Sequence, residues 1–217
     1  MRELKLLVVH RDDLVDERRR AQQRLRWHLH ELDPMLTIPP GALDRAAQLE
    51  RVSRWLARRE QTVLVRIARD LVGRFRSLTR AVVELERELA AMTVQIAPAL
   101  LELPGCGALT AAKLLAEIGS IERFRSDAQL ARHGGVAPLQ ASSGRVRRHR
   151  LERGGNRQLN CALHRIAVTQ ARVHPAARAY LERKQAEGKS RREAIRCLKR
   201  QLARLVFNTL KASPVLT

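Results

Sequence analysis

Aromatic residues are scarce in this 217-residue chain, at 3% of the sequence. This scarcity argues against a β-sandwich and against recognition of nucleic acid by stacking bases on aromatic platforms. No apolar run approaches the ~20 residues that a membrane-spanning helix needs, and residues 1–9 are too short an apolar segment for a signal peptide. The three cysteines lie far apart in no CxxC pattern, so we expect a reducing, cytoplasmic environment and no structural zinc.

Acidic residues are also few, because 22 Asp and Glu stand against 42 Lys and Arg, for a formal net charge of +20. Such an excess indicates a polyanionic partner, of which nucleic acid is the usual one and an anionic membrane the weaker alternative. Residues 101–217 carry 23 basic and 8 acidic side chains, against 19 and 14 in residues 1–100. We therefore expect DNA, and no membrane, to bind the second half of the chain.

Apolar residues recur at helical spacing and predict a mainly α-helical chain. One helix is expected over residues 2–32 and a second over 43–59. Between residues 64 and 96 the apolar positions alternate in steps of four and three, as a coiled coil requires. We expect this seam to form a homo-oligomer; the alternative is a long helix packed inside its own domain. The predicted division is a helical linker and coiled-coil region, 1–99, and a second helical domain, 100–217.

The segment LPGCGALTAAKLLAEIG (residues 103–119) is typical of a helix-hairpin-helix-like motif. Gly105 and Gly107 allow a tight turn with positive φ, after which Thr110 opens an amphipathic helix. The N–H groups at the start of such a helix bind phosphate without reading the base sequence. Lys113 lies one turn into the helix and is the expected charged partner. The alternative is a plain pair of packed helices.

A serine-containing loop and a basic run follow the motif. Ser126 and Asp127 are N-cap candidates for a short helix, and another helix is expected over residues 157–173. Between them, residues 142–158 hold one acid and six arginines: Arg145, Arg147, Arg148, Arg150, Arg153 and Arg157. A loop serine commonly forms local hydrogen bonds. The alternative is that the Ser143 hydroxyl attacks a phosphodiester while guanidinium groups neutralise the phosphate charge.

Basic residues also line one face of a predicted amphipathic helix beyond residue 190. Arg192, Arg196 and Lys199 are the residues expected to bind phosphate there, and a merely solvated face is the alternative. Contacts of this kind make affinity fall steeply with salt.

Several motifs of this chain together resemble one family. They are GGVAP followed after four residues by SG (134–144), RGGNRQLN (153–160), the LPGCG segment above, and RELKLLVVHRDDLV near the N-terminus. In combination they resemble the insertion-sequence transposases related to the Piv DNA invertase, the IS110 family. The resemblance covers nearly the whole chain.

The resemblance implies a function and a set of partners. Members join a RuvC-like domain, whose four acids bind Mg²⁺, to a C-terminal domain through helices that include a coiled coil. The C-terminal serine directly before the glycine, here Ser143, resembles the nucleophile of DNA strand exchange. A structured guide RNA is the further partner that the resemblance implies.

The departure from the family lies at the N-terminus. In the family, a segment like RELKLLVVHRDDL follows the last catalytic aspartate, and this chain begins there. We therefore expect it to lack the RuvC-like domain, to hold no metal itself and to be inactive alone in transposition or site-specific recombination. Three alternatives stay open for it: a truncated or decayed gene, an internal-start product, or a fragment that acts with a full-length transposase. The alternative function is a non-catalytic, dimerising module that binds DNA or RNA.

Overall fold

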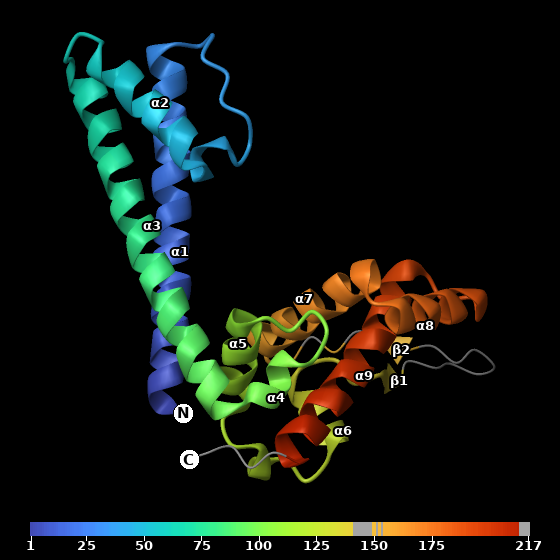
Figure 1. Ribbon diagram of the computed structural model, residues 1–217. Coiled ribbons are helices and arrows are strands. Elements are labelled where there is room, and N and C mark those ends of the chain that lie inside the picture. Colours follow the sequence, from blue (N-terminus) through green and yellow to red (C-terminus); the bar gives the residue numbers. More distant parts are fainter. Residues whose placement is uncertain (141–148, 151, 153, 213–217) are drawn as a thin grey trace. The chain divides into compact units, whose positions relative to one another are not determined.

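The computed structural model describes residues 1–140, 149–150, 152 and 154–212, and for residues 149–150 it describes the backbone. These residues are mainly helical, as predicted (Figure 1). They form two compact units, Val9–Arg87 and Met1–Val8 with Glu88–Thr217. The boundaries fall inside two long helices and so differ from the predicted division between residues 99 and 100.

The unit Val9–Arg87 is built on two long antiparallel helices, α1 (Arg2–Leu32) and α3 (Val63–Ile96). Ion pairs from Arg11 to Glu86 and from Arg74 to Glu17 join them side by side. Helix α2 (Ala46–Ala57) follows a 3-10 turn, η1 (Ala42–Asp44), and completes the unit. The predicted first helix is confirmed to the residue, and the second is shorter at both ends than predicted.

The seam of α3 is buried within the chain. Ala68, Leu71 and Phe75 pack in one cluster with side chains of α1 and α2. The further buried members are Leu78, Val82 and Leu89. The Arg18 guanidinium of α1 also lies 5.7 Å from the centre of the Phe75 ring. The structure thus shows the alternative interpretation of this seam, a long helix packed inside its own chain. A homo-oligomer stays a prediction.

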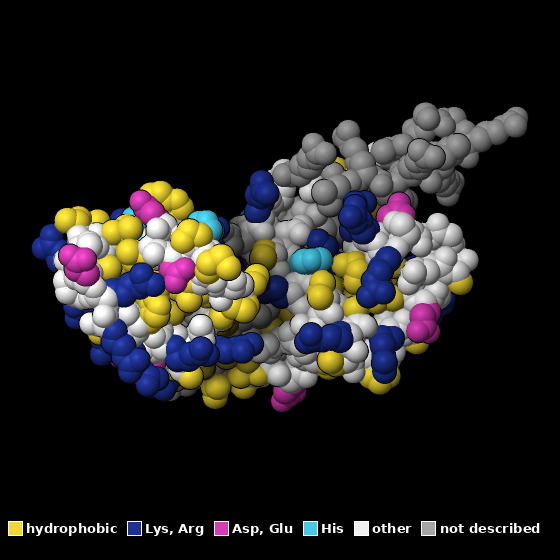
Figure 2. All heavy atoms as spheres, turned by 90° about the horizontal axis from the view of Figure 1, so that it is seen from above, with side chains coloured by type: hydrophobic (Ala, Val, Ile, Leu, Met, Phe, Trp, Pro, Cys, Tyr) yellow, Lys and Arg dark blue, Asp and Glu magenta, His cyan; other side chains and the backbone are white. Residues whose placement is uncertain are grey.

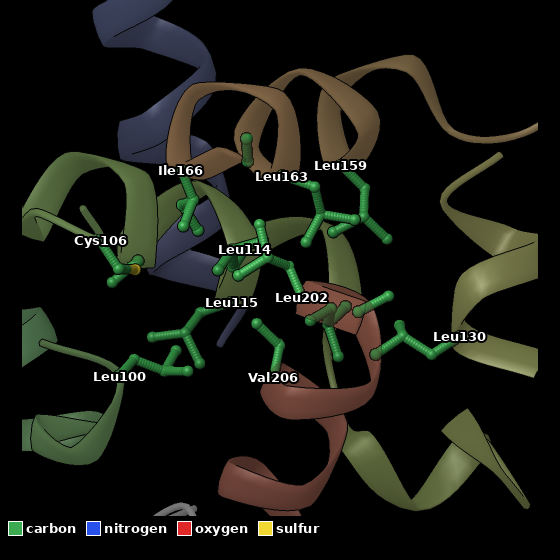
Figure 3. Close-up of a cluster of buried hydrophobic side chains, with 14 of the residues drawn as sticks. Leu100, Cys106, Leu114, Leu115, Leu130, Leu159, Leu163, Ile166, Leu202 and Val206 are labelled. Atoms are coloured by element: carbon green, nitrogen blue, oxygen red, sulfur yellow. The ribbon is translucent and has the colours of Figure 1, made fainter. Parts of the chain in front are cut away.

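The unit formed by Met1–Val8 and Glu88–Thr217 surrounds α5 (Ala108–Ile118), which packs against α7 (Arg157–Val173). Helix α9 (Arg191–Ala212) packs on α6 (Asp127–His133), α7 and α8 (Pro175–Ala186). Figure 3 shows Leu114 and Leu115 of α5 among side chains of α7 and α9, including Leu163, Leu202 and Val206. The short helix α4 (Pro98–Leu101) and the turn η2 (Ile121–Arg123) cover this core.

Polar side chains fix where the helices of this unit begin. The Ser126 hydroxyl accepts a hydrogen bond from the Gln129 amide at the start of α6, which confirms the predicted cap. Asn156 accepts from the Leu159 amide at the start of α7, so the RGGNRQLN segment includes a helix cap. The predicted helix over residues 157–173 is confirmed.

The LPGCG turn differs in part from its prediction. Gly105 has φ +80°, and a Cβ there would lie 3.1 Å from the Thr169 Cβ of α7, so glycine is required. Gly107 has φ −74° and caps α5, which begins at Ala108. Helix α5 is buried on nearly all sides, including residues 111–116 and 118. Lys113 itself is 8% exposed.

Candidate nucleic-acid interface

A cleft of about 1030 Å³ lies between α7 and the first half of α9. It is lined by four of the predicted binding residues, Arg157, Arg192, Arg196 and Lys199, together with Arg191. Residues 192, 196 and 199 share one face of α9 because helical neighbours recur at three and four positions. Arg157, Asn160 and His164 share a face of α7 for the same reason, and the two faces meet at this cleft.

The arginines of this cleft are available to an anionic ligand, because no ion pair among the described residues occupies them. Among the described residues no carboxylate lies within ion-pair distance of Arg157, Arg191, Arg192 or Arg196, and all four side chains are exposed. By contrast, Arg200 on the same helix pairs with Asp127 at 2.8 Å. Lys and Arg side chains are spread over the face drawn in Figure 2, where Asp and Glu side chains are fewer. Glu152 is the one acid among the residues that line the cleft.

Lys199 occupies the floor of the cleft and is only 7% exposed. Its Nζ donates to Asn160 Oδ1 at 2.7 Å. Burial lowers the pKa of Lys199, and the nearby Arg196 guanidinium lowers it further. Burial also lowers the pKa of His164, with Lys199 as the second cause. An anion bound here would oppose the effect of Arg196 on Lys199 and that of Lys199 on His164, and so would raise both pKa values.

Asn160 connects Lys199 to the GGVAP segment. Its Nδ2 donates to the carbonyl oxygens of Gly134 at 2.8 Å and Gly135 at 3.1 Å. Asn156, one turn earlier, donates from Nδ2 to Glu117 Oε2 at 2.6 Å, and its backbone N–H donates to the His133 carbonyl at 2.6 Å. Asn160 therefore holds the GGVAP segment against α7, while Asn156 connects the start of α7 to α5 and to the end of α6.

Two glycine pairs meet where these segments touch. A Cβ on Gly155 would lie 2.2 Å from the Gly135 nitrogen and 2.3 Å from its Cα, which is closer than any side chain allows. Gly135 has φ +62°, a conformation that also favours glycine. The second glycine of the HGG motif and that of the RGG motif are thus explained by backbone contact between segments 20 residues apart.

A short hairpin stem begins beside this contact. Strand β1 (Leu139–Gln140) pairs antiparallel with β2 (His149–Arg150), with Leu139 opposite Arg150. Ser143, Arg145, Arg147, Arg148 and Arg153 lie outside the described residues, and for Arg150 only the backbone in β2 is described. Their predicted roles stay predictions, but the described stem shows which part of the fold carries Ser143.

A second cleft, of about 780 Å³, adjoins the first. It is lined by Gly135–Pro138 from the incoming arm of the hairpin and by Tyr180, Lys184 and Arg200 from α8 and α9. Glu152, Arg196 and Lys199 line both clefts. Lys199 therefore lies where the two clefts meet.

The helix-hairpin-helix-like residues lie elsewhere. Neither Gly105, Gly107 nor Lys113 lines either cleft. Lys113 is buried inside the unit and is poorly placed to reach a DNA phosphate. The role predicted for this segment is untested, while Gly105 has a packing role against α7.

Sequence reasoning missed two polar residues of the cleft as binding candidates, Asn160 and His164. Their spacing held a signal. Residues 157, 160 and 164 recur at three and four positions along a predicted helix, as do 192, 196 and 199 on another. The pairing of these two faces depends on tertiary packing, which the spacing alone does not determine.

Neither a metal site nor a membrane span is found in the described part of the chain. Across residues 1–140, 152 and 154–212, no three His, Cys, Asp or Glu side chains converge as ligands for a metal ion. None of the helices described is both long enough and apolar enough to cross a bilayer. Cys106 is buried, and burial raises the pKa of its thiol to about 11, as expected for a packing residue.

Comparison with known proteins identifies the class of this chain. Residues 97–182 match the family described as Transposase IS116/IS110/IS902 family. This match covers the LPGCG turn, the hairpin stem, α7 and most of α8. The chain therefore carries a transposase region of the IS116/IS110/IS902 family, and the predicted resemblance is confirmed.

Individual relatives agree with this assignment. The chain is 34% identical over 162 residues to the 43.6 kDa protein of insertion element IS110 from Streptomyces coelicolor, covering 70% of this chain and 40% of that protein. It is 26% identical to the 44.8 kDa protein of IS116 from Streptomyces clavuligerus, covering 99% and 65%. A 42 kDa protein of IS900 from Mycobacterium paratuberculosis is 32% identical over 52% of this chain and 29% of its own length. The matches thus span less than two thirds of each relative.

Proposed function

We propose that this chain acts in DNA transposition as the nucleic-acid-binding, serine-bearing part of an insertion-element transposase. The observation that carries the proposal is the arginine-lined cleft between α7 and α9. Its exposed guanidinium groups have no carboxylate partner among the described residues, so they can bind phosphates bidentately without first breaking an ion pair. The family of residues 97–182 and the insertion-element relatives support DNA as the polyanion.

The proposed chemistry combines the cleft with Ser143. The cleft would bind the DNA backbone, and the hairpin that carries Ser143 begins directly beside it. Attack by the serine oxygen on a phosphodiester forms a serine–DNA phosphoester and releases a DNA hydroxyl. Arginine side chains stabilise the charge that develops on the non-bridging oxygens.

Any metal ion that the proposed reaction needs would be bound outside the described residues of this chain. The described residues do not fit a Mg²⁺ site, since no set of carboxylates converges among them. The proposed reaction therefore uses no metal ion held by these residues. A RuvC-like domain, from a full-length transposase acting in trans, would supply the metal-binding acids, and a structured guide RNA would be a further partner.

A second candidate function is a non-catalytic module that binds DNA or RNA. The same cleft favours it, because backbone binding by arginine does not depend on the serine. The two candidates differ in what removal of the Ser143 hydroxyl does, and they agree that the cleft binds phosphate.

Removing two cleft charges is expected to weaken nucleic-acid binding and its dependence on salt. In the double variant Arg192→Gln/Arg196→Gln, two phosphate contacts disappear, so the slope of log affinity against log salt concentration falls by about 1.8. Fluorescence anisotropy with a short DNA duplex over a range of salt concentrations measures the slope.

The matched control removes two charges away from the cleft. Arg172 and Arg178 are exposed residues of α7 and α8 that line neither cleft. The double variant Arg172→Gln/Arg178→Gln has the same net charge as the cleft variant, and we expect it to keep the wild-type slope. Equal losses in both variants would mean that the cleft is not the binding surface.

A further inference from the structure

Lys199 is a buried cation whose hydrogen-bonding capacity is only partly used. An ammonium group has three N–H donors, and Asn160 Oδ1 is the one acceptor that the described part of the chain places within hydrogen-bond distance. No carboxylate among those residues pairs with it. Burying a charge beside a single neutral acceptor is costly unless an anion completes its environment.

The position of Lys199 indicates where that anion would bind. The side chain lines both clefts, whereas Arg157, Arg191 and Arg192 line only the first. Arg196 lines both clefts as well and is exposed. A phosphate at the junction would therefore meet one exposed guanidinium group and one buried amino group, and the Glu152 side chain is the third that lines both clefts.

Hydrogen bonds through Asn160 connect Lys199 to the two glycines that precede the hairpin. Lys199 donates to Asn160, and Asn160 donates to the Gly134 and Gly135 carbonyls. These glycines directly precede Val136, whose amide donates to the Ala131 carbonyl at 2.8 Å. The returning arm is held at the same place, because Gly155 lies against the Gly135 backbone.

We propose that Lys199 binds a single backbone phosphate at the junction of the two clefts and, through Asn160, couples this contact to the position of the hairpin stem that carries Ser143. The inference rests on the proposed function and adds a positioning residue to it. Lys199 is assigned a positioning role because it acts through Asn160 on the backbone. Binding of DNA would thus order the stem before any reaction.

The test compares three variants of the whole chain with a short DNA duplex as the probe. Lys199→Met removes the amino group at nearly constant volume. We expect the salt slope to fall by about 0.9. We also expect loss of the protection that DNA gives the wild-type amides of Val136 and Asn156, about 10-fold in hydrogen exchange.

Two further variants separate the phosphate contact from the coupling. Arg192→Met removes one exposed cleft cation that has no contact with Asn160, so its slope also falls by about 0.9 while the DNA-induced protection remains. Asn160→Leu keeps the Lys199 amino group and removes its hydrogen-bonded connection to the glycines. We expect its salt slope to stay near the wild-type value and the DNA-induced protection of the Val136 and Asn156 amides to be lost. Thermal unfolding of each variant without DNA reports whether it folds.

Each outcome decides a separate point. A wild-type slope in Lys199→Met overturns the phosphate contact. Equal loss of amide protection in Lys199→Met and Arg192→Met overturns the coupling between the phosphate contact and the stem. These two variants test the coupling even where Asn160→Leu does not fold. Salt-independent binding by the wild-type chain would instead overturn the proposed function itself.

Discussion

Replacing Gly155 with alanine is expected to destabilise the unit that holds the cleft by about 3 kcal/mol, toward the upper end of overpacking costs. The new Cβ would lie 2.2 Å from the Gly135 nitrogen and 2.3 Å from its Cα. Both are backbone atoms, so no side-chain rotation relieves the clash, and the two segments must separate. For a chain of this size the loss lowers the Tm by about 6–12 °C, as calorimetry would measure.

The neighbouring glycine provides the control. A Cβ on Gly154 would meet only the end of the flexible Glu152 side chain, at 3.3 Å, among the described residues. Gly154→Ala is therefore expected to change the free energy of unfolding by less than about 0.5 kcal/mol, as surface substitutions usually do. If both variants unfold at the wild-type temperature, the glycine contact does not hold the base of the hairpin.

Replacing Ser143 with alanine is expected to abolish DNA strand transfer while leaving DNA affinity nearly unchanged. Removing a nucleophile typically costs a factor of about 1000 or more in rate, because no other group takes over the covalent step. The assay mixes the chain with a full-length transposase whose own serine has been removed and measures joined DNA. Anisotropy on the same proteins measures binding.

Ser142 is the matched control, since it is the adjacent hydroxyl in the same loop sequence. We expect Ser142→Ala to keep most of the strand transfer. Should Ser143→Ala remain active, the serine is not the nucleophile and the non-catalytic binding module becomes the better account. A parallel loss of affinity and activity would indicate a structural serine.

The helices were predictable where periodicity and caps act locally. The apolar spacing of residues 2–32 and of 157–173 predicts α1 and α7 at their observed bounds. Helix α8 escaped prediction because its apolar spacing is weak, although Pro175 stands at its first turn. The α3 seam shows a further limit, since a four-three repeat does not reveal whether its partner is a second chain or α1.

The charges of the site were predictable and its connections were not. Arg192, Arg196 and Lys199 followed from spacing on one helix, and the structure adds α7 as the opposite wall. The contact of Gly155 with Gly135, and the bonds from Asn160, depend on segments brought together by folding. The burial of Lys113 was not predictable either, because a lysine in an otherwise apolar segment lies buried with its neighbours.

The most direct test of the cleft as the nucleic-acid interface is arginine modification with phenylglyoxal, read by mass spectrometry with and without bound DNA. The account predicts that DNA protects Arg157, Arg191, Arg192 and Arg196 and leaves Arg172 and Arg178 reactive. Protection of Arg172 and Arg178 with the cleft arginines still reactive would contradict it.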